Sequence, residues 1–266
     1  VDYTARREAL TIVDGEVTEF VNAQEITVGT LTYERTGFPV NTWVSLYVPF
    51  EIPVSKLTEL GYDVAYPNDI HFKGAEDDGV VDEIWAEYIK INAGVLKANF
   101  PYMIRANNQE ATTMELVLEE TTLYSTDSEQ TVIECSSAFY KFNFAGTYEA
   151  VNRTDIGYEE GVTSCFAVAN SGNWAEFTKD THTLNPFRVY MTMTAKAGAP
   201  YIIPDEVMKS IGARVVGEEN EDGTTVIYDV NAENGEDVIY DLNGRRVLET
   251  EKGGLYIING KKVLVK

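Results

Sequence analysis

The sequence has no run of about 18 apolar residues, the length that a membrane-spanning helix needs, so we expect no membrane insertion. Basic residues are scarce: 21 lysines and arginines stand against 43 aspartates and glutamates, a formal net charge of −22. Nucleic acids and anionic membrane surfaces bind basic patches, so this balance argues against both as partners. It leaves cation binding open, although an acidic excess is also typical of a solvated surface.

Residues that commonly build reaction centres are few or unsuitably spaced. Two histidines far apart, His71 and His182, do not complete a metal site with Cys135 and Cys165. The two cysteines either form one disulfide or remain as buried free thiols, and the sequence leaves both open. Ser164 next to Cys165 has no spacing to His182 that is known for cysteine catalysis. Nucleophile-elbow, phosphate-loop and dinucleotide motifs are absent, so we predict no catalytic residue, no metal and no cofactor.

Acidic clusters have two interpretations. Asp77-Asp78-Gly79 with Asp82 and Glu83 resembles a calcium loop, but the spacing is wrong for an EF-hand, and we interpret it as a solvated loop tip. A glycosidase needs two carboxyl groups roughly 5–10 Å apart across a cleft. With 43 acidic residues, chance pairs are expected. Neither pattern identifies a site.

Aromatic residues are abundant, with 16 tyrosines and 11 phenylalanines. Trp43, Trp85 and Trp174 would suit a sugar-stacking platform, but they alternate with aliphatic residues, which favours packing in a core. The ligand-binding residues are therefore unknown from the sequence.

Short alternating apolar runs dominate the chain, and helical periodicity is nearly absent. In residues 42–50, Val44, Leu46, Val48 and Phe50 share one parity, and the other parity carries Trp43 and Tyr47. This pattern predicts a well-covered strand that ends at Pro49, because proline cannot donate to a sheet ladder. We expect the other strands to be built around it. Asp14-Gly15 predicts a hairpin turn between residues 11–13 and 17–21.

The overall prediction is an all-β fold in three parts. A β-sandwich-like region covers 1–205, with a long hairpin loop or a subdomain seam at the polar stretch 125–130. The acidic segment within 206–223 predicts a linker, and 224–266 predicts a small C-terminal β-module. Two Asn-Gly pairs, Asn243-Gly244 and Asn259-Gly260, predict hairpins in this module.

The tail resembles the sorting domains that Bacteroidales bacteria use in type IX secretion. The motifs that carry this likeness are Tyr240-Asp241-Leu242-Asn243-Gly244-Arg245-Arg246-Val247, Gly254-Leu255-Tyr256-Ile257 and Asn259-Gly260-Lys261-Lys262-Val263. The preceding region is similar to Bacteroidales surface proteins, including those of the BspA kind. That likeness is carried by residues 31–36, 43–50, 96–102 and 185–190. The resemblance implies a β-rich extracellular module and transfers no catalytic residue.

These features together predict a non-catalytic, secreted or cell-surface module of a structural or adhesive kind, not an enzyme. Its ligand is an unidentified extracellular glycan or protein. We expect that a leader before Val1 has been removed. Two alternatives stay open: a carbohydrate-binding or carbohydrate-active protein, and a fragment whose function lies in repeats upstream.

Overall fold

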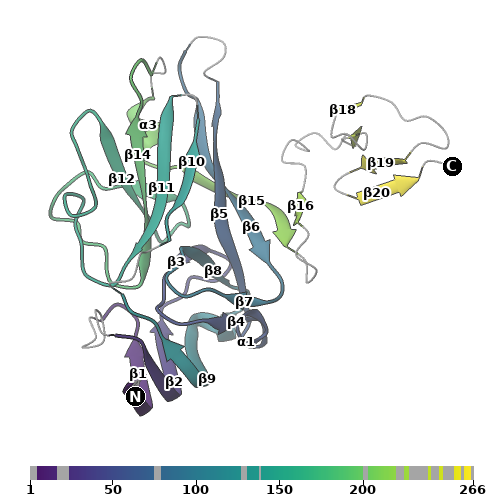
Figure 1. The fold of residues 1–266 in the computed structure, drawn as a ribbon. Coiled ribbons are helices and arrows are strands. Elements are labelled where there is room, and N and C mark those ends of the chain that lie inside the picture. Colours follow the sequence, from purple (N-terminus) through teal and green to yellow (C-terminus); the bar gives the residue numbers. More distant parts are fainter. Residues whose placement is uncertain are drawn as a thin grey trace.

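The computed structural model shows a mostly β protein, with 55% of residues in strands and 7% in helices, which confirms the all-β prediction. It describes residues 5–16, 24–74, 79–126, 131–137, 139–199 and 203–219, together with short strands between 225 and 264. Two large sheets face each other as a sandwich, and a smaller sheet packs near its lower end (Figure 1).

The first large sheet has six strands, and all neighbours are antiparallel except β15 and β6. In spatial order they are β16 (Thr225–Ile227), β15 (Gly212–Glu219), β6 (Glu83–Ile91), β5 (Tyr62–Lys73), β8 (Tyr102–Ala106) and β3 (Trp43–Leu46). Alternation along β6 buries Ile84, Ala86 and Tyr88 on the face that meets the second sheet. Glu87 and Ile89 on the other face of β6 are buried as well, so this strand is covered on both sides near its middle.

The second large sheet is antiparallel throughout. Its order is β10 (Ile133–Ser136), β11 (Tyr140–Thr147), β14 (Arg188–Ala195), β12 (Thr163–Val168) and β13 (Trp174–Glu176). Phe142 packs on Phe72 of the first sheet, with ring centroids 5.8 Å apart. Trp174 is fully buried, and its Nε1 donates a 2.7 Å hydrogen bond to the Tyr88 hydroxyl of β6. These contacts close the sandwich core.

The third sheet contains β1 (Ala5–Val13), β2 (Ile26–Thr36) and β9 (Thr113–Leu123). β1 pairs with β2 in parallel, and β2 pairs with β9 in antiparallel. The second strand of the hairpin predicted at Asp14-Gly15, residues 17–21, lies outside the described residues. The remaining elements are β4 (Ile52–Pro53), α1 (Val54–Glu59), β7 (Val95–Leu96), the 3-10 helix η1 (Gln109–Thr112) and α3 (Asp205–Met208).

The strand predicted over 42–50 is shorter and less central than expected. β3 ends at Leu46 and forms an edge of the six-stranded sheet, so the prediction of a strand that reaches Pro49 was wrong. Beyond Leu46 the backbone hydrogen-bonds with three separate segments. Tyr47 N donates to Phe187 O (3.2 Å), and Val48 O and Pro49 O accept from Asn99 N (2.9 Å) and Tyr124 N (2.7 Å). All residues from 44 to 50 are nevertheless buried, because the segment lies among several packed elements.

The linker predicted over 206–223 contains regular structure in its described part, and residues 220–223 lie outside the described residues. α3 occupies part of it, and β15 pairs in parallel with β6 inside the six-stranded sheet. β16, predicted within the C-terminal module, adds to the same sheet through β15. The acidic residues of β15 fit a strand because they lie near its end, where Glu218 accepts a 3.0 Å hydrogen bond from Asn92. A composition typical of a linker thus belongs to a paired strand.

Four short strands near the C-terminus form a separate sheet whose described strands pair only with one another. They are β18 (Arg246–Val247), β17 (Ile239–Tyr240), β19 (Leu255–Ile258) and β20 (Lys261–Leu264). β17 pairs in antiparallel with β18, and β19 with β20, as predicted for strands that flank the two Asn-Gly pairs. Most of the polar stretch predicted as a seam, 127–130, lies outside the described residues.

A buried ionic network joins the three sheets near the lower end of the sandwich. Asp14 accepts two hydrogen bonds from Arg188 of β14 (2.6 and 2.5 Å) and one from the Tyr33 hydroxyl of β2 (2.6 Å). The Asp14 carboxylate also lies 3.5 Å from Arg35, which donates to the carbonyl of Ser45 in β3 (2.7 Å). Burial lowers the pKa of Arg35, and the charge of Arg188 lowers it further. The sequence pointed to Asp14 only as a turn residue.

Candidate functional site

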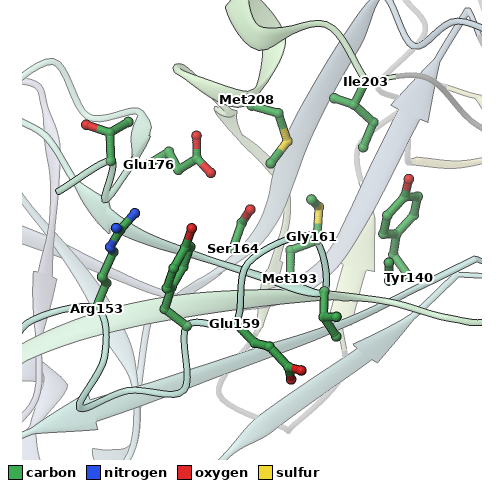
Figure 2. A pocket seen from close by; sticks show the side chains of 13 residues that line it. Tyr140, Arg153, Glu159, Gly161, Ser164, Glu176, Met193, Ile203 and Met208 are labelled. Carbon is green, nitrogen blue, oxygen red and sulfur yellow. The ribbon is translucent and has the colours of Figure 1, made fainter. Parts of the chain in front are cut away.

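A cleft of about 510 Å³ opens between the five-stranded sheet and the segment that carries α3. Ile203 and Met208 contribute one wall, and the opposite wall comes from the sheet and from the loop before β12 (Figure 2). The lining residues are Tyr140, Arg153, Tyr158, Glu159, Gly161, Val162, Ser164, Glu176, Thr178, Met193, Ala195, Ile203 and Met208.

The floor of the cleft comes from three neighbouring strands. In the sheet register, Ser164 of β12 lies opposite Met193 of β14, and Phe166, two residues further on, lies opposite Glu176 of β13. Because side chains alternate between the faces of a strand, Met193, Ser164 and Glu176 all project from the same face. The floor is therefore held by paired strands rather than by loops.

One edge of the cleft is occupied by Arg153, whose guanidinium already has partners. Its Nε donates to Asp180 at 2.5 Å, and its Nη1 donates to the carbonyl of Phe177 at 3.4 Å. The guanidinium also lies 3.8 Å from the centre of the Tyr158 ring. The hydrogen bond with Asp180 is the main cause that raises the pKa of Arg153. The positive charge of Arg153 is thus largely satisfied within the protein.

Two carboxylates line the cleft without such partners. No hydrogen bond or ion pair joins the Glu159 or Glu176 side chain to any other residue that the structure describes. A tight turn fixes Glu159 at the rim, where its carbonyl accepts from Thr163 N (2.8 Å) and Gly161 has a φ of +73°. Figure 2 shows the Glu176 carboxylate directed into the cleft beside Ser164 and Met208, and the Glu159 carboxylate directed away from it. The two acids do not face each other.

The cleft is consequently electronegative and of mixed polarity. Glu176 offers a carboxylate acceptor and a negative charge, and Ser164 offers a hydrogen-bonding hydroxyl. Met193 and Met208 supply an adaptable apolar surface. Such a lining suits a ligand that carries hydrogen-bond donors or a cation next to an apolar part, and it repels anions.

The serine, cysteine and histidine weighed in the sequence lie apart. Ser164 lines the cleft, whereas Cys165 points to the opposite face and packs with Ala167, Phe177 and Leu184. His182 is not among the lining residues, and His71 lies on β5 with its Nε2 2.7 Å from Glu87. Alternation along β12 therefore separates Ser164 from its neighbour.

The three tryptophans occupy different places. Trp174 lies in the core, as its alternation predicted. Trp43 is half-buried, with the Arg105 guanidinium 4.9 Å from its ring centre. Trp85 is stacked on the His71 ring at 5.2 Å, with Arg214 on it at 4.3 Å. None of the three lines the cleft, so they do not form one sugar-stacking platform there.

The predicted alternatives for the cysteines are resolved: Cys135 and Cys165 are both buried free thiols. Cys135 Sγ donates to the carbonyl of Asn68 (3.3 Å) and Cys165 Sγ to that of Arg153 (3.7 Å). Burial raises the pKa of Cys135 to about 12 and that of Cys165 to about 11. The thiolate, which is the reactive form, is thereby suppressed.

We expect both thiols to resist a disulfide reagent such as DTNB at about pH 8 and to react once the protein is unfolded in guanidinium. The unfolded thiols titrate near their ordinary value of 9.0, below the folded ones. The unfolded state therefore loses protons first, and the free energy of unfolding should fall as the pH rises above 9. Cys135→Ala and Cys165→Ala should each reduce that fall. Stoichiometric labelling of the native protein within seconds would contradict this expectation.

The acidic segment from Asp77 to Glu83, predicted as a solvated loop tip, is only partly described. Asp77 and Asp78 lie outside the described residues, and Glu83 accepts a 2.6 Å hydrogen bond from Arg214. Among the residues that the structure describes, no group of three or more histidine, cysteine or acidic side chains is arranged to hold a metal ion.

A second cavity of about 270 Å³ lies beside the six-stranded sheet and was also not anticipated from the sequence. Phe100 packs on Tyr66 and Tyr102 there, with ring centroids 6.3 and 4.6 Å apart, and Lys97 and Glu219 are part of its lining. Lys97 N donates a 2.8 Å hydrogen bond to the Tyr102 hydroxyl. The cleft on the five-stranded sheet is the larger of the two, about 510 against about 270 Å³, and is therefore the candidate site.

Comparisons with protein-family models, with curated proteins and with solved structures found no match for this chain. In the part of the chain that the structure describes, no helix is long and apolar enough to cross a membrane. The cleft itself is therefore the feature from which a function can be inferred.

Proposed function

We propose that this chain is a non-catalytic, secreted or cell-surface binding module of a structural or adhesive kind, and that the cleft on the five-stranded sheet holds its ligand. The observation that carries the proposal is the unpartnered Glu176 carboxylate beside Ser164 on a rigid strand floor. Binding sites gain affinity when polar groups are held ready in a concave, partly apolar surface. The likeness of the chain to Bacteroidales surface proteins supports the extracellular assignment.

The lining of the cleft supports binding rather than turnover. Ser164 has no histidine beside it among the lining residues, and a nucleophilic serine needs an adjacent base. Glycoside hydrolysis needs two carboxyl groups on either side of the bond that is broken. Glu159 and Glu176 are directed differently, which does not suit that role.

A carbohydrate ligand is the second candidate, favoured by Tyr140 and Tyr158 in the same cleft as the carboxylates. Aromatic rings suit the apolar face of a sugar, and carboxylates accept hydrogen bonds from its hydroxyls. Release of reducing sugar from a bound polysaccharide would show that the module is an enzyme. We expect binding without such release.

Ser164→Phe should fill the cleft floor and weaken binding of the true ligand by at least about tenfold, because the ring occupies the space that the ligand needs. The test screens the 266-residue chain on arrays of glycans and matrix proteins, then compares this variant by surface plasmon resonance. Val117→Phe is the matched control, since Val117 is exposed on β9, away from the cleft. Equal binding by both variants, with unchanged melting temperatures, would reject the cleft as the site.

A further inference from the structure

One backbone edge of the five-stranded sheet is open beside the cleft. β13 is an end strand and pairs with β12 on one side only. Phe177 N donates to Cys165 O at 2.8 Å, so the backbone N–H of Phe177 faces β12. The backbone groups of Trp174 face the outer edge instead, where its N–H and C=O pair with Ile211 at 2.8 and 2.9 Å. The chain thus makes a single bridge to this outer edge before it continues into β15.

The next outward-facing groups on this edge are unpaired. Backbone groups of successive residues in an antiparallel strand alternate in direction, so those of Glu176 face the same side as those of Trp174. Thr178 follows two residues later, just beyond the end of β13. No backbone hydrogen bond joins Glu176 or Thr178 on this side to any described residue. Both residues line the cleft. An open edge of this kind is a template for an added strand.

The charge beside this edge indicates what the added strand carries. Glu176 projects into the cleft with no hydrogen bond or ion pair to a described residue, and Glu159 stands at the rim. The one cation among the described lining residues, Arg153, donates to Asp180 at 2.5 Å and feels the charge of Glu176 only as a weaker, longer-range attraction. The chain has a formal net charge of −22, which attracts cations from a distance. A cationic side chain that enters the cleft would find Glu176 as its nearest free counter-charge.

We propose that the cleft and the open edge of β13 together bind an extended, lysine- or arginine-bearing segment of a partner protein. The backbone of the segment adds to β13 at Glu176 and Thr178, and its basic side chain pairs with the Glu176 carboxylate. Glu159 at the rim adds attraction at longer range. This inference rests on the proposed binding function and specifies its ligand; a neutral glycan has neither the peptide groups that satisfy the edge nor the cation that satisfies Glu176.

The test uses a fluorescein-labelled peptide, Thr-Val-Thr-Lys-Thr-Val-Thr, and fluorescence anisotropy with the full chain at about 0.15 M salt, where distant charges are screened. The same peptide with glutamate in place of lysine should bind at least about tenfold more weakly, because it meets a like charge. A third version, N-methylated on every amide between the terminal residues, keeps the side chains but has no N–H group on either edge that could extend the sheet. It should also lose about tenfold in affinity.

Variants of the protein separate specific pairing from general attraction. Glu176→Gln should weaken binding of the lysine peptide about tenfold, and Glu159→Gln about two- to threefold, since only the former carboxylate points into the cleft. Glu160→Gln is the matched control, because Glu160 is exposed and does not line the cleft, so affinity should stay unchanged. Equal effects of all three variants, or no effect of N-methylation, would overturn the inference.

Two results separate failure of this inference from failure of the proposed function. If a neutral polysaccharide binds the wild type, Ser164→Phe abolishes that binding and the lysine peptide does not bind, the further inference is wrong and the proposed function stands. If the lysine peptide binds equally to the wild type and to Ser164→Phe, both fail.

Discussion

Asp14→Ala is expected to lower the free energy of unfolding by about 3–5 kcal/mol, the range observed when one partner of a buried ion pair is removed. The Asp14 side chain is only 5% exposed and binds Arg188, the Tyr33 hydroxyl and Arg35 together. Removing it leaves Arg35, itself 6% exposed, beside Arg188 without the intervening negative charge. Two like charges then face each other in a poorly hydrated region, which disfavours the folded state.

Urea unfolding followed by tryptophan fluorescence, with thermal melting as a second probe, measures this change. Glu34→Ala is the control. Glu34 lies on β2 between Tyr33 and Arg35, which belong to the network, but its side chain is exposed. This substitution should change the stability by less than about 0.5 kcal/mol. A loss below about 1 kcal/mol for Asp14→Ala would mean that the network contributes little to holding the three sheets together.

Gly146→Ala is expected to destabilise the protein by about 2–3 kcal/mol, the upper part of the range for overpacking a core. A Cβ at Gly146 would lie 2.0 Å from the nearest ring carbon of Tyr47, far inside contact distance. Tyr47 is fully buried and packs on the Tyr148 ring at 4.7 Å, so it has little room to move. The β11 backbone must therefore shift, and its pairing with β14 is strained.

Gly212→Ala is the matched control in another strand. There the nearest atom to an added Cβ is 3.6 Å away, an ordinary contact, so the stability should change by less than about 0.5 kcal/mol. A double-mutant cycle with Tyr47→Leu tests the mechanism. The two changes should be less destabilising together than the sum of their separate effects, and strict additivity would refute the clash between Gly146 and Tyr47.

Local pattern predicted much of the fold. The shared parity of Val44 and Leu46 predicted a well-covered strand, and both residues are buried in β3. The Asn-Gly pairs predicted antiparallel hairpins in the tail, and the strands on either side of each pair are antiparallel. The prediction of a linker did not anticipate β15, because Glu218 and Glu219 made this segment resemble a solvated one. Composition does not report that a strand has a distant partner, here β6.

The candidate cleft could not be predicted from the sequence, for a related reason. Its lining combines Tyr140, Arg153, Glu176 and Met208, which no local motif connects. They meet because β14 lies between β11 and β12 although it follows both in the chain. Of the lining residues, the sequence drew attention only to Ser164, as the neighbour of Cys165. Alternation along β12 places Cys165 on the opposite face, away from this cleft.

By itself the sequence determined the local pattern of the chain: strands rather than helices, and an acidic excess with a formal net charge of −22. Tertiary structure decided which strands became neighbours, and with that the ionic network at Asp14, the open edge of β13 and the cleft at Glu176. The physical reason is that side-chain alternation is a local property of the backbone, whereas strand pairing depends on hydrogen bonds and packing between segments far apart in the chain.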